Sequence, residues 1–258
     1  MIELKTPAEI EAMRPAGRFV ADVLAALRTK AAPGVNLLEL DALAASMIAE
    51  RGAVSCYVDY EPAGFGKGPF GYSLCTSVND AVLHGRPYDY ALREGDVLSV
   101  DFAASVGGWV SDAAITLVVG STPNPEGTRL IRATEEALAA GIAAAQPGAK
   151  TGDISHAIGE VARAYGLKVN LEFGGHGVGH TMHEDPHISN DGRPGRGFKL
   201  QPGMVMAIEP WFMSTTDRLR TDSDGWTLRS ADGSLTAHSE HTVAITETGN
   251  VVLTAPAA

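Results

Sequence analysis

The chain has 258 residues, 45% of them hydrophobic, and is long enough to bury a large core. Its net charge of −11 and the absence of a basic tract exclude nucleic acid as an expected partner. Residues 1–7 lack the blocks of a signal peptide, and no apolar stretch approaches the roughly 20 residues that span a bilayer. Cys56 and Cys75 are the only cysteines and show no disulfide pattern, which fits the reducing cytosol. From these features together we expect a cytoplasmic protein without a membrane partner.

The predicted elements begin with two helices. The first starts at Thr6-Pro7, where Thr6 can cap the helix and Glu9 can complete a capping box. It ends before Pro33-Gly34, and its apolar residues follow helical spacing at Ile10, Met13, Gly17, Val20, Leu24 and Leu27. Asn36 and Glu39 start the second helix in the same way. Its predicted buried stripe consists of Leu40, Leu43, Met47 and Ile48.

The rest of the chain combines strands with two further helices. Residues 57–73, rich in glycine and aromatic residues, predict an irregular loop. A third helix is expected from Asn124-Pro125 and a fourth from near Asp153 to Tyr165. Strands are predicted at residues 97–104, 109–119, 204–212 and 239–247. The pattern predicts an α+β fold, in which helices cover the outer face of a curved, mostly antiparallel sheet.

The two halves of the chain repeat each other. Pro33-Gly34 and Pro147-Gly148 each end an Ala-rich helical segment, and each is followed at the same distance by a glycine, Gly52 or Gly166. A His-x-x-Pro loop and two strands that carry acids recur in the same order in both halves. Chance similarity of Ala-rich helices is disfavoured, because the matches keep their order and place acids opposite acids. We therefore expect one domain over residues 1–258, made of pseudo-twofold halves at roughly 1–120 and 121–258 with a shared cleft.

Acidic residues within apolar strands are candidate metal ligands. Asp101 and Glu209 each follow a glycine turn and lie among Val, Leu, Ile and Met, where a charge is costly unless it is compensated. Asp112 and Glu240 lie on the following strands of their halves, and His176 lies in a glycine-rich stretch that permits close backbone approach. Four acids and one imidazole exceed the needs of one ordinary site. The set predicts two divalent ions roughly 3.5–4 Å apart, with Mn, Fe(II), Co and Zn all suitable.

Each of these residues also has a simpler interpretation. A single Asp in a strand is more often an ion-pair or turn residue than a ligand, and His176 could be an ordinary loop histidine. We expect His238 and His241 to be exposed or structural, and the acids at 184–185 to lie in a solvated loop. The paired layout of the acids in both halves favours the metal interpretation over these alternatives.

Two formal motif matches are rejected. His183-Glu184-Asp185-Pro186-His187 matches H-E-x-x-H, but that zinc signature requires a helix, which Pro186 disfavours. The glycines around His176 miss G-x-G-x-x-G, because His180 stands where the last glycine should be. The sequence also contains no P-loop and no nucleophile elbow.

The five candidate ligands match, in order and context, those of the pitta-bread metallopeptidases. Over almost its whole length the chain resembles the type I, bacterial form of the methionine aminopeptidase family. The motifs that carry the resemblance are Ser77-Val78-Asn79-Asp80 with His84-Gly85, Gly175-His176-Gly177-Val178-Gly179, His183-Glu184-Asp185-Pro186, Ala207-Ile208-Glu209-Pro210 and Ser239-Glu240-His241-Thr242. The absence of a long insertion between His187 and Glu209 resembles type I rather than type II.

The resemblance implies roles for the site residues. Asp112 and Glu240 would bridge two divalent ions, Asp101 would complete one, and His176 with Glu209 the other. A metal-bridging water would attack the first peptide carbonyl while Glu209 shuttles the proton. His84 and His183 would contact the scissile amide and assist the leaving group. The methionine side chain would lie against Phe70, Cys75, His84, Met182 and Trp226.

The resemblance also implies a substrate, the N-terminal methionine of peptides and nascent chains whose second residue is small. The ribosome is a further candidate partner, and we expect a monomer. Three features depart from the family pattern: Met182 replaces an aromatic residue, His180 is unusual, and the loop at 57–73 is longer. Pocket preference is therefore less defined than the chemistry.

Two other functions stay open. A proline-specific peptidase would share the five ligands, although such relatives usually carry a large amino-terminal domain. A non-enzymatic binding protein on the same fold is the second alternative, which the presence of all five ligands disfavours.

Overall fold

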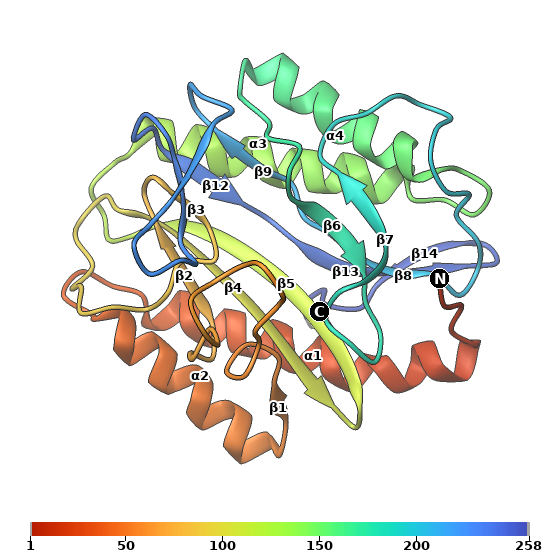
Figure 1. Ribbon diagram of the computed structural model, residues 1–258, viewed down its shortest axis with the longest axis horizontal. Coiled ribbons are helices and arrows are strands. Elements are labelled where there is room, and N and C mark those ends of the chain that lie inside the picture. The colour runs from red at the N-terminus through yellow and green to blue at the C-terminus, as the bar shows by residue number, and fades with distance from the viewer. Residues whose placement is uncertain (1, 257–258) are drawn as a thin grey trace.

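The computed structural model describes residues 2–256, which fold into antiparallel strands flanked by helices (Figure 1). The helices are α1 (Pro7–Lys30), α2 (Leu37–Arg51), α3 (Pro125–Ala144) and α4 (Thr151–Tyr165). The strands of the first half are β1 (Val54–Ser55), β2 (Cys75–Val78), β3 (Ala81–Leu83), β4 (Val97–Val106) and β5 (Trp109–Val118). Those of the second half are β6 (Gly174–Gly177), β7 (Glu184–Ser189), β8 (Val205–Ile208), β9 (Trp211–Met213), β10 (Leu219–Thr221), β11 (Leu228–Ser230), β12 (Thr236–His238), β13 (His241–Thr246) and β14 (Gly249–Val252).

The helices begin where their capping residues predict. The Thr6 hydroxyl accepts the Glu9 N–H at 3.3 Å, and the Glu9 carboxylate accepts the Thr6 N–H at 2.7 Å. Asn36 and Glu39 form the same reciprocal cap on α2. The fourth helix starts before the predicted Asp153, because that carboxylate accepts the Lys150 N–H from the third helical position. The predicted α1 stripe is buried, whereas only Leu40 of the predicted α2 stripe is, and the rest of that stripe (Leu43, Met47 and Ile48) is half-buried at the edge of the core.

Two antiparallel sheets meet at a seam between the halves. One has the order β1-β4-β2, with β5 on the other side of β4, and the other has the order β14-β13-β8-β6-β7. Ala114 of β5 forms a bridge to Glu240, beside β13. The Thr242 hydroxyl accepts the Asp112 N–H at 2.9 Å and donates to the Asp112 carbonyl at 2.7 Å. These bonds place the acids of both halves at one seam.

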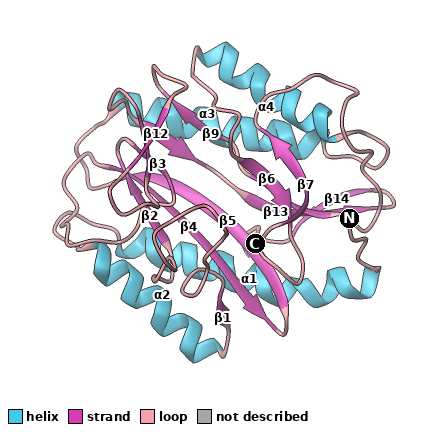
Figure 2. Cartoon of the chain, viewed as in Figure 1, coloured by secondary structure: helices cyan, strands magenta, loops and turns pink. Residues whose placement is uncertain are grey.

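Helices cover the outer faces of the two sheets (Figure 2). Helix α1 packs on β4 and β5, while α3 packs on β8, β9 and β12 and α4 packs on β7. Side chains such as Leu27 and Ile158 are fully buried there, each contributing about 1.5–3 kcal/mol to stability. The α+β architecture expected from the sequence is therefore confirmed. No helix within the described residues is long and apolar enough to cross a membrane.

Two strand predictions are wrong, because the structure interrupts the strand in each of these ranges. The predicted strand at 204–212 is split into β8 and β9, with Glu209-Pro210 between them. Proline has no N–H to give to a sheet ladder, so pairing stops there. The strand predicted at 239–247 is also shorter, since β12 ends at His238 and β13 begins at His241. Both interruptions coincide with a site carboxylate.

Backbone angles repeat between the halves as the sequence repeat predicts. Gly34 and Gly148 both have φ of +89°, and they stand at equivalent positions in the two halves. Gly52 and Gly166 both end a helix in the left-handed region, with φ of 64° and 65°. The correspondence supports a duplication, because the same turns close the same helices.

Candidate metal centre and substrate pocket

Strand register brings the first two acids together. Asp101 of β4 pairs with Ala114, and Asp112 of β5 pairs with Ala103, so the two acids are diagonal neighbours on one face of the sheet. Glu240 joins them from the second half, because its bridge partner is Ala114. The short connection between β4 and β5 allows this antiparallel pairing.

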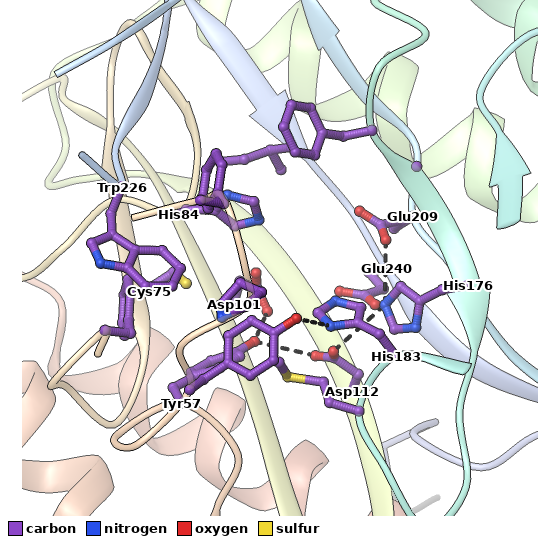
Figure 3. A pocket seen from close by; sticks show the side chains of 18 of the residues that line it. Tyr57, Cys75, His84, Asp101, Asp112, His176, His183, Glu209, Trp226 and Glu240 are labelled. Carbon is purple, nitrogen blue, oxygen red and sulfur yellow. Dashed lines mark hydrogen bonds and ion pairs between the residues drawn. The ribbon is translucent and has the colours of Figure 1, made fainter. Parts of the chain in front are cut away.

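The second half supplies His176 and Glu209. His176 of β6 pairs with Ala207 of β8, two residues before Glu209. Its Nε2 lies 3.5 Å from Glu209 Oε1 and 3.9 Å from Asp112 Oδ2 (Figure 3). A Cβ on the neighbouring Gly177 would collide with the Asp185 carbonyl, which explains the glycine at that position.

The tautomer of His176 is fixed by its own backbone. The ring Nδ1 lies 2.9 Å from the carbonyl oxygen of Gly177, which can only accept, so Nδ1 carries the proton. Burial, with His183 nearby, lowers the pKa of His176 to about 3 and keeps the ring neutral. Nε2 is therefore an unprotonated donor atom that faces the carboxylates, the form in which imidazole binds metals.

Three of the four acids are buried, Asp101 is half-buried, and the cluster has no basic partners among the described residues. Among the described residues, no lysine or arginine forms an ion pair with Asp101, Asp112, Glu209 or Glu240. Burial raises the pKa of Asp101 to about 6 and of Glu209 to about 8. Burial and the neighbouring acids raise the pKa of Asp112 and Glu240 well above the usual range. Such a cluster is costly unless cations offset its charge.

These residues fit a divalent cation site. One carboxylate oxygen of Glu240, Oε1, is buried and has no hydrogen-bond partner. Ligand atoms of Asp112, His176 and Glu240 lie within 4.8 Å of one another. An unpartnered buried oxygen beside converging oxygen and imidazole donors is the arrangement that a metal ion would satisfy.

The expectation that His238 is exposed or structural is wrong as to exposure. Its side chain is 2% exposed, and Nε2 lies 3.7 Å from Glu209 Oε2 and 3.8 Å from Glu240 Oε2. Burial lowers the pKa of His238 to about 3. His241 is half-buried and contacts Thr254, consistent with a structural role. No short-range pattern distinguishes His238 from His241, because both histidines flank the Glu240 turn.

The expectation of a solvated loop at 184–185 is wrong for Glu184. That carboxylate lies 2.5 Å from the Nζ of Lys5, whose side chain is almost wholly buried. The H-E-x-x-H match is not helical, since residues 184–189 form strand β7.

A cavity of about 400 Å³ opens beside the carboxylates. Figure 3 shows Trp226, Cys75 and His84 on one side of it, and His176, Glu209 and Glu240 on the other. The structure brings together every residue that the sequence assigned to the substrate pocket: Phe70, Cys75, His84, Met182, His183 and Trp226. The cavity wall is mainly apolar, so the cavity suits an uncharged side chain of a bound molecule.

The two predicted proton-handling histidines lie in this cavity. His84 adopts a left-handed backbone angle, φ of 54°, and its Nδ1 has no hydrogen-bond partner. Burial lowers the pKa of His84 to about 4. The His183 ring lies 4.3 Å from the His176 ring, centroid to centroid. Both rings line the same cavity as the carboxylates.

Sequence reasoning missed several lining residues. Tyr57, Tyr60, Phe65 and Phe173 also form the wall. Three of them come from the loop at 57–73, and the many aromatic residues of that loop are the sequence feature that could have indicated a role in the cavity wall. The loop has no regular periodicity, so its sequence does not indicate which side chains face the cavity.

Fold and site together define a class of protein. Metallopeptidase family M24 matches residues 11–247, and the chain belongs to this family of metal-dependent peptidases. The pitta-bread architecture expected from the sequence is therefore confirmed. The chain is similar to "Methionine aminopeptidase" of Aquifex aeolicus, with 43% identity over 98% of each chain. It is also similar to the methionine aminopeptidase structure from Thermotoga maritima, with 40% identity, a TM-score of 0.92, and 98% and 99% of the two chains covered.

A prolidase structure shares the fold at a greater distance. The prolidase from Pyrococcus furiosus is 25% identical, with a TM-score of 0.75, and the match covers 99% of this chain and 66% of that chain. The greater similarity therefore lies with the methionine aminopeptidases.

Proposed function

We propose that this chain is an aminopeptidase that removes the N-terminal methionine from peptides and nascent proteins by metal-dependent hydrolysis. The observation that carries the proposal is the buried acid cluster without basic partners, opening directly into an apolar cavity. Similarity to methionine aminopeptidases over 98% of the chain supports the choice of substrate. Substrates would have a small second residue, and nascent chains at the ribosome in the cytoplasm would be their source. We take the acting form to be a monomer.

Two divalent ions are the proposed cofactors. Asp112 and Glu240 would bridge them, Asp101 would complete one, and His176 with Glu209 would complete the other. Mn, Fe(II), Co and Zn all suit this set of oxygen and imidazole donors. When bound, the ions would acidify a water molecule and stabilise negative charge on the peptide carbonyl.

Protein groups would handle the proton. Glu209 would shuttle the proton, since its carboxylate lines the cavity beside the other candidate ligands. His84 and His183 both have lowered pKa values, so their neutral rings can donate hydrogen bonds to the scissile amide without carrying charge. Both rings line the cavity, with His84 across from Glu209 and His183 beside His176, so a substrate amide between them could contact both.

The cavity suits an unbranched thioether. Phe70 and Trp226 pack edge to face at 5.3 Å and present aromatic surface beside Cys75. Methionine sulfur makes favourable contacts with such ring edges. Met182 replaces an aromatic residue on this wall, and we expect its flexible side chain to widen the range of accepted side chains.

Release of the first residue from a panel of peptides tests the proposal. Metal-loaded protein should release methionine from Met-Ala-Ser, and far more slowly from Met-Lys-Ser. Cleavage of Xaa-Pro peptides in preference to Met-Ala-Ser would instead establish a proline-specific peptidase. Folded, metal-loaded protein that releases nothing from any peptide would favour a binding protein.

A further inference from the structure

One turn of the loop after β1 places the side chains of Tyr57 and Tyr60 in the site. The Tyr60 N–H donates to the Tyr57 carbonyl at 2.9 Å and closes the turn. The Ser55 hydroxyl accepts the N–H groups of Tyr57 and Val58 at 3.2 and 3.3 Å, which fixes where the turn begins. The spacing of the two tyrosines is therefore set by backbone geometry.

Tyr57 contacts the acids of the first half. Its hydroxyl donates to Asp101 Oδ1 at 2.6 Å and lies 3.4 Å from Asp112 Oδ1 (Figure 3). The side chain is buried, and Phe70 packs against the ring at 5.7 Å in an edge-to-face arrangement. A buried phenol in this position holds the Asp101 carboxylate in one orientation.

Tyr60 contacts the histidine of the second half. Its hydroxyl lies 2.8 Å from His183 Nδ1, and its ring packs against the rings of His183 and Trp226. Within residues 2–256, His183 Nδ1 is the only hydrogen-bond partner of the Tyr60 hydroxyl, and we assign the phenol as the donor of this pair. A neutral His183 then carries its proton on Nε2, which becomes the ring donor available to a substrate.

We propose that the Tyr57–Tyr60 turn is a positioning element with two separable tasks. Tyr57 orients Asp101 for one of the two divalent ions, and Tyr60 holds His183 in the tautomer protonated on Nε2. The inference rests on the proposed function and deepens it, because it assigns metal affinity to Tyr57 and the rate of turnover to Tyr60. Groups that orient a ligand from behind typically change metal affinity about 10–100-fold when removed.

Two conservative variants separate the tasks. Tyr57→Phe should weaken Mn²⁺ binding to metal-stripped protein about 10–100-fold at one of two sites, measured by calorimetric titration. At saturating Mn²⁺ its kcat for Met-Ala-Ser should recover to within about threefold of the parent value, because the carboxylate stays in place. Tyr60→Phe should leave both Mn²⁺ affinities unchanged and lower kcat about 10–100-fold.

A third measurement does not depend on turnover. Imidazole ¹⁵N spectra of the Zn²⁺-loaded protein should show His183 protonated on Nε2, and Tyr60→Phe should give mixed tautomers. Tyr72→Phe is the matched control, because Tyr72 belongs to the same loop but contacts Phe70 and Arg86 rather than the carboxylates. It should match the parent protein in all three readouts.

Several results would overturn the assignment. Parent-like Mn²⁺ binding by Tyr57→Phe would show that Tyr57 does not orient Asp101 for metal binding. An unchanged His183 tautomer in Tyr60→Phe would show that Tyr60 does not set that tautomer. If both variants shift all parameters together with a loss of melting temperature, the turn is only packing. If the parent binds two ions but releases no methionine, the proposed function fails, while titration and ¹⁵N spectra still decide the roles of the two tyrosines.

Discussion

Glu240 shows at the scale of single residues why the acid cluster is a site rather than part of the core. Its side chain is 2% exposed, and one of its oxygens lacks any hydrogen-bond partner. A core built only for stability would replace such a group by an apolar one, which is often neutral or stabilising. The chain instead keeps three buried acids and the half-buried Asp101 together, which is explained if cations join them.

Substitution by alanine should distinguish the metal ligands of the site from the residues that do not bind metal. His176→Ala should abolish methionine release and lose metal, because the ring offers its free Nε2 to the carboxylates. Glu209→Ala should likewise abolish turnover, and neither change should unfold the protein. His84→Ala should lower turnover sharply and keep the metal content.

Metal content by atomic absorption and kcat for each variant test this separation. Near-parent activity in His176→Ala or Glu209→Ala would contradict the ligand assignment. Loss of metal from His84→Ala would make His84 a ligand and contradict its assigned contact with the amide.

The raised pKa values predict how the metal-free protein responds to pH. Asp101 and Glu209 bind protons more tightly in the folded chain, with pKa values of about 6 and 8, than in the unfolded chain, at about 4. Their contribution to stability is present below pH about 4 and is lost as pH rises through about 6 to 8.

Urea denaturation in the presence of a chelator tests this pH dependence. The free energy of unfolding should fall between about pH 7 and about pH 8, above the unfolded-state pKa of the buried histidines, and saturating Mn²⁺ should reverse the fall. Stability that rises over this range without metal would contradict the buried, protonated acids.

At the scale of elements, an internal ion pair holds the segment that carries His183. Lys5 is 4% exposed and lies 2.5 Å from Glu184 Oε2. The other oxygen of Glu184 accepts the N–H groups of His180 and Thr181 at 2.9 and 3.3 Å. The segment before α1 thereby fixes the turn that leads from His180 into β7.

Removal of the cation should destabilise this turn. Lys5→Met leaves Glu184 without its buried partner and should cost about 3 kcal/mol of stability, with a lower kcat because His183 loses support. Arg14→Met, which breaks an exposed pair with Glu11, should change stability by less than about 1 kcal/mol. Equal effects of the two variants in urea denaturation would contradict the special role of Lys5.

Local signals made the helices predictable, and long-range contacts made part of the site unpredictable. The caps at Thr6 and Asn36 act within one turn, so sequence spacing identifies them. The splitting of the strands around Glu209 and Glu240 depends on where the chain must leave the sheet to present a carboxylate. The Lys5–Glu184 pair joins residues far apart in sequence, and no short-range pattern indicates it.

The four acidic candidate ligands were predictable because each breaks a local rule. An acid in an apolar strand contradicts its surroundings, and repetition in the second half gave each anomaly a partner. The burial of His238 and the phenol contacts of Tyr57 break no such rule in the sequence. They arise from packing between the seam and a loop of irregular backbone.

At the scale of the whole molecule, the two halves share their site and their hydrogen bonds. Thr116 and His238 exchange bonds across the seam, as Thr242 and Asp112 do. We propose that residues 1–258 form one catalytic domain, because neither half holds the complete acid cluster. Each half would also expose seam groups that the other half satisfies.

A single domain predicts one cooperative unfolding transition. Scanning calorimetry should give equal calorimetric and van't Hoff enthalpies for the chelated protein. A fragment of residues 1–120 should not fold by itself. Two resolved transitions, or a folded fragment, would contradict the shared seam.

The most direct measurement is methionine release from Met-Ala-Ser by metal-stripped protein during stepwise addition of Mn, Fe(II), Co or Zn. We predict no release without metal, recovery with at least one ion, and no recovery in Glu240→Gln. Full release by thoroughly stripped protein, or recovery in Glu240→Gln equal to the parent, would contradict the assignment of the buried acid cluster as the metal centre.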